Sequence, residues 1–240
     1  MYKNNRIVAI IPARKGSKGI KNKNLIKLLG IPLINYSINY AKKSKLIDRI
    51  FVSTDGENIL KTSKNFGAEV IKRPKKYAID TASSDSAVVH AIKFIKEKLG
   101  YEFDIVVFLQ PTTVLRKIGE LDQAIKMLVN RKLDTVFSSV DYQPFLWSRF
   151  KKNLRPNNFN PQKRKRRQNI FTINETGSYY ITKKVAFLKT KNRFGNKILN
   201  FNSDYHSMLE IDKMNDLKYL IDLIKTNIPK KYKLCIPNKS

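Results

Sequence analysis

Cysteine is almost absent from this chain of 240 residues, which contains only Cys235. A single cysteine excludes a disulfide framework and a cysteine-based metal site within one chain, and it fits a reducing compartment. Long apolar runs are also lacking, because no stretch approaches the ~18 residues of a membrane-spanning helix. The first residues, MYKNNR, lead directly into a predicted strand, so we expect no secretory signal, no membrane and a cytoplasmic protein.

Acidic residues are scarce: 19 Asp and Glu stand against 48 Lys and Arg, for a formal net charge of +29. A nucleic-acid-binding protein carries such a charge as its electrostatic footprint. A small-molecule enzyme with anionic substrates carries it as background bias with a focused cleft. The lysines are spread along the whole chain, and no helix-turn-helix, zinc-finger or RNP signature occurs. We therefore favour background bias and expect no nucleic-acid partner.

Short apolar runs and amphipathic stretches alternate along the first part of the chain. The predicted strands are 7–13, 49–53, 69–72, 105–109 and 135–140, and the predicted helices are 31–43, 57–66, 84 or 85 to 99, and 118–130. Apolar strands joined by helices indicate a mostly parallel sheet covered on both faces. With 42% hydrophobic residues the chain can bury one sizeable core. We therefore expect a single doubly wound α/β domain over residues 1–240.

This alternation stops between residues 141 and 176, where prolines, asparagines and the basic run 163–167 follow no regular period. An irregular excursion of ~35 residues is uncommon in a compact domain and is usually functional or an interface. Beyond it we predict strands at 178–182 and 208–212 and a closing helix at 215–225.

The sequence IVAIIPARKGSKGIKNKN, residues 7–24, begins as a buried strand and breaks into glycines and cations. Glycines let backbone N–H groups approach phosphate oxygens, and Arg and Lys supply opposing charge, as in a polyphosphate cradle. An ordinary solvated loop explains this stretch equally well, because it matches neither the P-loop nor the G-x-G-x-x-G pattern.

Ligands of a parallel sheet bind at the carboxyl ends of its strands. Polar or basic loops follow several predicted strands, namely 14–24, Asp55, 73–84 and 110–116. We expect all of them at the same edge of the sheet.

Glu210 and Asp212 are two residues apart on a predicted strand, so alternation places both carboxylates on one face and Ile211 on the other. Mg²⁺ bridging them to a nucleotide phosphate is one interpretation. The other, which periodicity alone favours, is a solvated pair screened by lysines.

The basic run 163–167 has three interpretations: a solvated face, a nucleic-acid or nuclear-import patch if the source is a eukaryote, or a segment with one arginine that grips a carboxylate. His90 lies on the expected buried side of a helix, which favours a core histidine over a catalytic base. We assign His206 no role.

Six short motifs occur in order along the chain. They are IPARKGSKGIKNKN (11–24), VSTD (52–55), KRP (72–74), DTASS (80–84), LQPT (109–112) and RRQ (166–168). Together they resemble the acylneuraminate cytidylyltransferase family, over about residues 7–220. The resemblance implies a nucleotidyltransferase sheet and transfer of CMP from CTP to the anomeric hydroxyl of a nine-carbon α-keto acid sugar, with release of pyrophosphate. It also implies homodimers in which the excursion of one subunit reaches the other's site.

The resemblance also implies roles for single residues. Arg14, Lys18 and Lys23 would contact the CTP phosphates, Asn24 the ribose, Arg73 and Ser84 the cytosine, Gln110 and Arg167 the sugar acid, and Asp212 with Glu210 a Mg²⁺ ion. Arg14, Lys23 and Asp212 would carry the catalysis, by positioning and by offsetting charge. No side chain stands out as a general base, so a metal-bound hydroxide or the metal-lowered pKa of the hydroxyl would serve.

Two positions depart from the family pattern, and the sugar stays open. The family commonly has Asp-x-Asp where this chain has Glu210-Ile211-Asp212, and Asn where Thr176 precedes Gly177. The same reaction on legionaminate, pseudaminate or an octulosonate fits the motif spacing as well as an N-acylneuraminate does.

Overall fold

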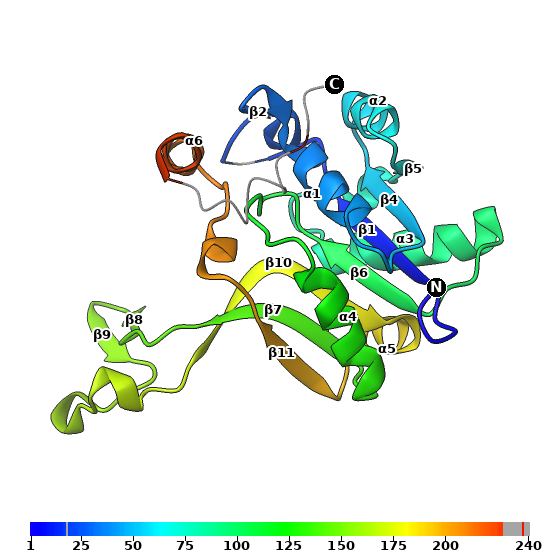
Figure 1. Ribbon diagram of the computed structural model, residues 1–240. Coiled ribbons are helices and arrows are strands. Elements are labelled where there is room, and N and C mark those ends of the chain that lie inside the picture. Colours follow the sequence, from blue (N-terminus) through cyan, green and yellow to red (C-terminus); the bar gives the residue numbers. More distant parts are fainter. Residues whose placement is uncertain (18, 228–236, 238–240) are drawn as a thin grey trace.

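A seven-stranded sheet lies at the centre of the computed structural model, which describes residues 1–17, 19–227 and 237 (Figure 1). The strand order is β11-β7-β10-β6-β1-β4-β5. Strand β10 runs antiparallel to its neighbours β6 and β7, and the other neighbouring pairs are parallel. The predicted α/β architecture with a mostly parallel sheet is confirmed.

The elements of the large sheet and its helices follow in chain order. The strands are β1 (Ile7–Pro12), β4 (Arg49–Thr54), β5 (Glu69–Lys72), β6 (Ile105–Leu109), β7 (Thr135–Asp141), β10 (Ile173–Lys183) and β11 (Ile198–Asn202). The helices are α1 (Leu33–Lys42), α2 (Glu57–Asn65), α3 (Ser84–Leu99), α4 (Glu120–Asn130), α5 (Lys184–Thr190) and α6 (Met214–Asn227). Two small hairpins are formed by β2 (Lys27–Leu28) with β3 (Ile31–Pro32) and by β8 (Trp147–Phe150) with β9 (Asn153–Pro156). None of these helices is both long and apolar enough to cross a membrane.

Both faces of the sheet are covered, as the unbroken apolar strands predict. Ile7, Ala9 and Ile11 of β1 face a core shared with α1, α2 and α4. Val8 and Ile10 point the other way, into a core shared with α3 and α5. The alternation of a strand thus builds two cores from one apolar run.

A third core joins α6 to the loop that follows β1. Ile20 of that loop packs with Ile211, and with Leu217 and Leu220 of α6. This packing brings the turn that carries Glu210 and Asp212 to the carboxyl end of β1, although the two segments are far apart in the sequence.

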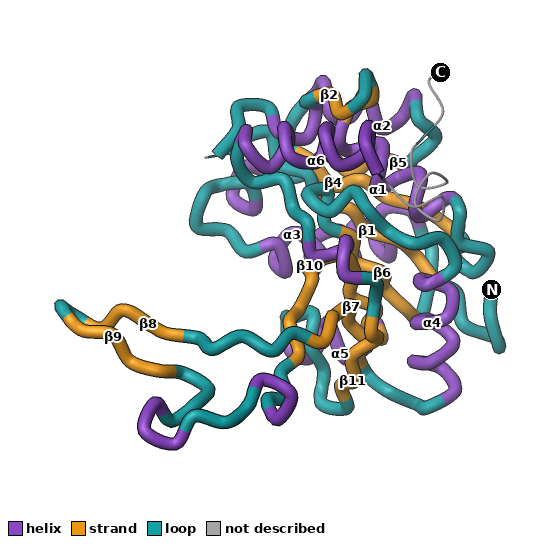
Figure 2. The backbone as a smooth tube through the Cα atoms, turned by 60° about the vertical axis from the view of Figure 1, so that its left-hand side comes forward, coloured by secondary structure: helices purple, strands orange, loops and turns teal. Residues whose placement is uncertain are grey.

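The excursion between β7 and β10 is here called the arm, residues 142–172. It contains the β8–β9 hairpin and the short 3₁₀ helices Pro161–Lys163 and Arg167–Asn169, so the prediction of an irregular segment over 141–176 is wrong in part. Residues 173–176 already belong to β10. Figure 2 shows the hairpin standing away from the rest of the chain.

Other local predictions need correction. Residues 208–212 form no strand: the 3₁₀ helix Tyr205–Met208 precedes an isolated bridge between Glu210 and Thr113, because no neighbouring strand offers a longer ladder. Ile211 is nevertheless buried, as alternation predicted. The cap of α3 is Ser83, whose hydroxyl accepts a hydrogen bond from the Ser86 N–H, rather than Ser84 or Asp85. Strand β11 and helix α5 were not predicted.

Candidate active site

A cavity of about 240 Å³ lies at the carboxyl ends of the central strands. The predicted residues that line it come from three connections: Arg14, Lys23 and Asn24 after β1, Arg73 and Ser84 at the two ends of the connection from β5 to α3, and Gln110 after β6. The prediction that these loops share one edge of the sheet is therefore confirmed. Asp55 lies beside them and accepts a hydrogen bond from the Lys15 N–H at 2.8 Å, but it lines a neighbouring cavity.

Two cations of the loop after β1 form ion pairs with carboxylates. Arg14 pairs with Asp80 at 2.7 Å, Lys23 pairs with Asp212 at 2.8 Å, and the Asn24 amide donates to the Arg14 carbonyl oxygen at 2.9 Å. A Cβ atom on Gly19 would lie 2.1 Å from the Asp212 carbonyl oxygen, so this close approach of two backbones requires glycine. Lys18 lies outside the described residues.

Arg73 forms one wall of this cavity from a buried position. Only 6% of the residue is exposed, and its guanidinium donates to the Ser53 carbonyl oxygen and to the Tyr77 carbonyl oxygen. Burial, with a smaller contribution from Arg14, lowers the pKa of the guanidinium to about 10. Arg73 therefore remains protonated at neutral pH and offers a rigid, charged donor to a ligand.

A second cavity, of about 500 Å³, adjoins the first. Its lining includes Gln110, Glu175, Thr176, Tyr180, Met208 and Glu210. Gln110 is common to both cavities, so its amide side chain lies where two ligands would meet.

The two predicted metal-binding carboxylates have different environments. The Asp212 side chain is 61% exposed and pairs with Lys23. Glu210 is mostly buried, and burial, followed by the charge of Asp212, raises the pKa of its carboxyl group. A Cβ atom on Gly177, which has a φ of +69°, would lie 2.1 Å from Glu210 Oε1. Glycine there lets this carboxylate lie against β10.

This pair fits Mg²⁺ better than a metal held entirely by protein. No group of three or more His, Cys, Asp or Glu that could hold a metal occurs among the described residues. Mg²⁺ commonly uses one or two carboxylates and completes its octahedron with phosphate oxygens and water. Asp216 fixes the turn by accepting hydrogen bonds from the Asp212 N–H at 2.9 Å and the Lys213 N–H at 2.7 Å.

Comparison with known sequences assigns the chain to a family. A profile described as "Cytidylyltransferase" matches residues 8–234. The chain belongs to the cytidylyltransferase family. It is 28% identical to an N-acylneuraminate cytidylyltransferase of Escherichia coli O18:K1:H7, over 91% of this chain and 52% of that protein. It is 35% identical to the N-acylneuraminate cytidylyltransferase of Oncorhynchus mykiss, over 73% of this chain and 40% of that one.

The chain spans about half or less of the length of those two relatives, but it matches another over nearly its whole length. A pseudaminic acid cytidylyltransferase of Campylobacter jejuni is 31% identical over 92% of this chain and 97% of that protein. Among solved structures, a CMP:2-keto-3-deoxy-manno-octonic acid synthetase complexed with CTP superposes with a TM-score of 0.69 at 14% identity, covering 93% of this chain and 100% of that one. This last likeness concerns the fold alone.

The sequence did not predict the role of one buried arginine of this chain. Arg116 is 1% exposed and donates to the Gln110 carbonyl oxygen at 2.6 Å. It also donates to the carbonyl oxygen and the hydroxyl of Ser178, at 3.0 and 2.9 Å, and to the hydroxyl of Ser37 at 3.1 Å. The guanidinium thus ties the end of β6 to β10 at the wall of the second cavity. A basic residue enclosed by Val114, Leu115 and Ile118 was the available signal.

Arg167 is the one described candidate that the fold keeps apart from the others. It begins the 3₁₀ helix Arg167–Asn169 on the arm, is exposed, and lines neither cavity. Within one chain the arm projects away from the sheet (Figures 1 and 2). Within one copy of the chain Arg167 is therefore separated from both cavities.

Proposed function

We propose that this cytidylyltransferase transfers CMP from CTP to the anomeric hydroxyl of a nine-carbon α-keto acid sugar of the N-acylneuraminate type, releasing pyrophosphate. The observation that carries the proposal is the placement of Gln110 between two adjoining cavities, one lined by cations and one free of them among the described lining residues. Legionaminate, pseudaminate and an octulosonate are the alternative acceptors of the same reaction.

The nucleotide occupies the first cavity in this proposal. Arg14, Lys18 and Lys23 bind the triphosphate, and Asn24 binds the ribose. Arg73 and Ser84 bind the cytosine, whose carbonyl oxygen and ring nitrogen accept hydrogen bonds from fixed donors. The buried, protonated state of Arg73 supports this role, because a guanidinium already held by protein loses little conformational freedom on binding.

The sugar occupies the second cavity. Its anomeric hydroxyl attacks the α-phosphorus in line, the bond from that phosphorus to the leaving pyrophosphate breaks, and the hydroxyl proton is released to water. Arg14 and Lys23 offset the charge that develops on the phosphate oxygens. Mg²⁺ held by Asp212, with Glu210 as a second ligand, would supply further neutralisation of the triphosphate.

A homodimer completes the site in this proposal. The arm exposes several large apolar side chains, namely Leu146, Trp147, Phe150, Leu154 and Phe171. An isolated two-stranded hairpin is marginal in water, so the β8–β9 hairpin is expected to be covered by a second copy. The partner's arm would then bring Arg167 to the carboxylate of the sugar.

The test is an assay of pyrophosphate release by the purified chain with CTP, Mg²⁺ and a panel of acid sugars: N-acetylneuraminate, legionaminate, pseudaminate and 3-deoxy-D-manno-octulosonate. We expect turnover with at least one, and the largest kcat/KM with N-acetylneuraminate. A larger kcat/KM with another acid would change the acceptor, and no turnover with any of them would refute the proposed reaction.

Substitution of Arg167 by alanine is expected to raise the KM for the sugar by at least about tenfold, because a charge-assisted hydrogen bond is lost, with little change in the KM for CTP. Mixing this variant with Lys23→Ala tests whether the residue acts across the dimer. Random exchange of subunits would restore roughly a quarter of the intact sites. Equal effects on both KM values, or no recovery on mixing, would remove Arg167 from the sugar site.

A further inference from the structure

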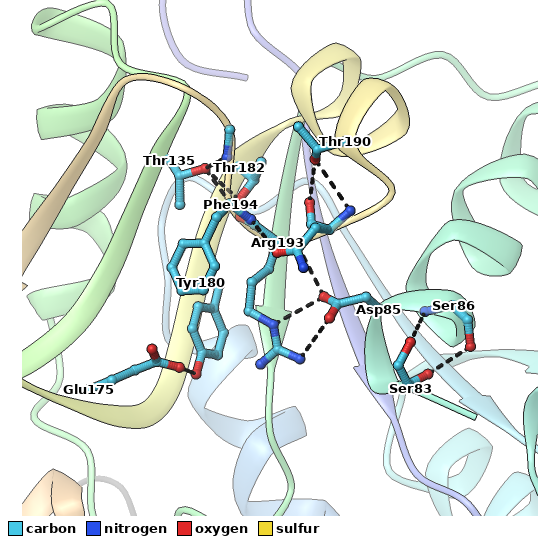
Figure 3. A network of polar contacts seen from close by, with 12 residues as sticks. Ser83, Asp85, Ser86, Thr135, Glu175, Tyr180, Thr182, Thr190, Arg193 and Phe194 are labelled. Carbon is cyan, nitrogen blue, oxygen red and sulfur yellow. Dashed lines mark hydrogen bonds and ion pairs between the residues drawn. The ribbon is translucent and has the colours of Figure 1, made fainter. Parts of the chain in front are cut away.

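Figure 3 shows a series of linked side chains that includes Asp85, Arg193, Tyr180 and Glu175. The series runs from helix α3, whose first residue Ser84 lines the first cavity, to the lining of the second cavity. It begins at Asp85, in the first turn of α3 next to Ser84. Asp85 holds the guanidinium of Arg193 by two hydrogen bonds, of 3.0 and 3.1 Å, and the two side chains are only 13% and 15% exposed. Both carboxylate oxygens of Asp85 accept hydrogen bonds from Arg193, so Asp85 fixes the position of the guanidinium.

Arg193 in turn restrains the position of the Tyr180 ring. Its guanidinium carbon lies 4.6 Å from the ring centroid of Phe108 and 4.5 Å from that of Tyr180. Phe108 lines the first cavity and Tyr180 the second, so one guanidinium fixes a ring of each. Burial, followed by the nearby Glu175, raises the pKa of the Tyr180 phenol, which therefore stays protonated as a hydrogen-bond donor.

The Tyr180 hydroxyl donates to Glu175, which is the end of this chain of groups. Glu175 lies in the exposed first part of β10 and lines the second cavity. An exposed glutamate is ordinarily mobile, and holding it in one rotamer costs conformational entropy. Here the hydrogen bond from the buried Tyr180 phenol restrains the carboxylate, so less conformational entropy is lost when a ligand binds to it.

The carboxylates in the lining of the second cavity determine which groups of a ligand can lie against it. Glu175 and Glu210 both border the second cavity, and none of the described residues that line it is lysine, arginine or histidine. A sugar carboxylate is repelled by such a wall, whereas hydroxyl and amide N–H groups are attracted to it as donors. The wall therefore orients an acid sugar with its carboxylate away from β10.

We propose that Glu175 is a specificity-determining residue, which accepts a hydrogen bond from a hydroxyl or acylamino N–H group of the acid sugar and so selects acceptors that carry a donor there. This inference rests on the proposed function. Tyr180 and Arg193 act as positioning residues, because the Tyr180 hydroxyl donates to the Glu175 carboxylate and the Arg193 guanidinium holds the Tyr180 ring.

The experiment uses the acid sugar that the wild-type chain turns over best, together with derivatives in which one hydroxyl is removed or methylated, or the amide nitrogen is methylated. Glu175→Ala is expected to raise the KM for the parent sugar about tenfold to a hundredfold, with the KM for CTP changed less than about twofold. Glu175→Gln, which still accepts from Tyr180, and Tyr180→Phe should each have smaller effects in the same direction. Glu97→Gln, an exposed position on α3, is the matched control and should leave every constant unchanged.

Non-additivity identifies the contact. For the derivative that lacks the recognised donor, wild type and Glu175→Ala should differ less than about threefold in kcat/KM, because the interaction is already lost. Effects that multiply for every derivative, or an equal rise in both KM values, would overturn the role of Glu175 while leaving the reaction intact. Absence of turnover by the wild type with every acid would instead refute the reaction and this inference together.

Discussion

Replacing Asp212 by asparagine is expected to lower the rate of pyrophosphate release by about a hundredfold or more at fixed Mg²⁺. The substitution keeps the size of the side chain and removes the negative charge of the proposed Mg²⁺ ligand. The Mg²⁺ concentration for half-maximal rate should rise as well. A coupled assay of pyrophosphate release across a series of Mg²⁺ concentrations measures both quantities.

Loss of stability would not explain such a result. The ion pair of Asp212 with Lys23 is 2.8 Å long, but the carboxylate is 61% exposed, so the pair contributes at most about 1 kcal/mol. Asp222→Asn, on the exposed side of α6, is the matched control and should retain the wild-type rate. Near-normal pyrophosphate release by Asp212→Asn at saturating Mg²⁺ would show that Asp212 is not a metal ligand.

Replacing Arg116 by methionine is expected to lower the free energy of unfolding by about 3–5 kcal/mol, the largest loss of stability that we predict. The substitution fills much of the volume but removes the guanidinium that donates to the Ser178 carbonyl oxygen, and it leaves the Gln110 carbonyl oxygen with the Ser37 hydroxyl as its remaining side-chain donor. For a chain of this length the melting temperature should fall by roughly 6 to 20 °C. Thermal and urea unfolding at one protein concentration would measure the change.

Two further variants separate the causes of that loss. Arg116→Lys keeps the charge but has no fork of donors, and it should lie between wild type and Arg116→Met. Lys117→Ala changes the exposed neighbour and should stay within about 0.5 kcal/mol of wild type. Wild-type stability of Arg116→Met would mean that the buried hydrogen bonds of the guanidinium contribute nothing net.

The sheet was predictable wherever a strand is buried on both faces, because such a strand reads as an unbroken apolar run. This holds for β1 and β6, whose predicted bounds agree with the structure within one residue. Edge and protruding strands lack that signal. β11 mixes apolar residues with asparagine and has one partner, and the first three residues of β10 are exposed, so neither pattern could be distinguished from a loop.

The site was predictable where the sequence is contiguous and was missed where it depends on distant partners. The loop after β1 carries its glycines and cations within a few residues. Arg116 forms its hydrogen bonds with Ser178, 62 residues away, and Asp85 pairs with Arg193, 108 residues away. No local pattern reveals such pairs, because the fold alone brings them together.

The antiparallel insertion of β10 has an evolutionary consequence. One end of this strand of 11 residues continues into the arm, and its interior carries Gly177 and Tyr180 at the second cavity. A change that slides or twists β10 and so moves the arm also moves this wall of the second cavity. Under the proposed function, selection on assembly through the arm and selection on substrate choice would therefore act on the same strand, so that a change in either property would constrain the other.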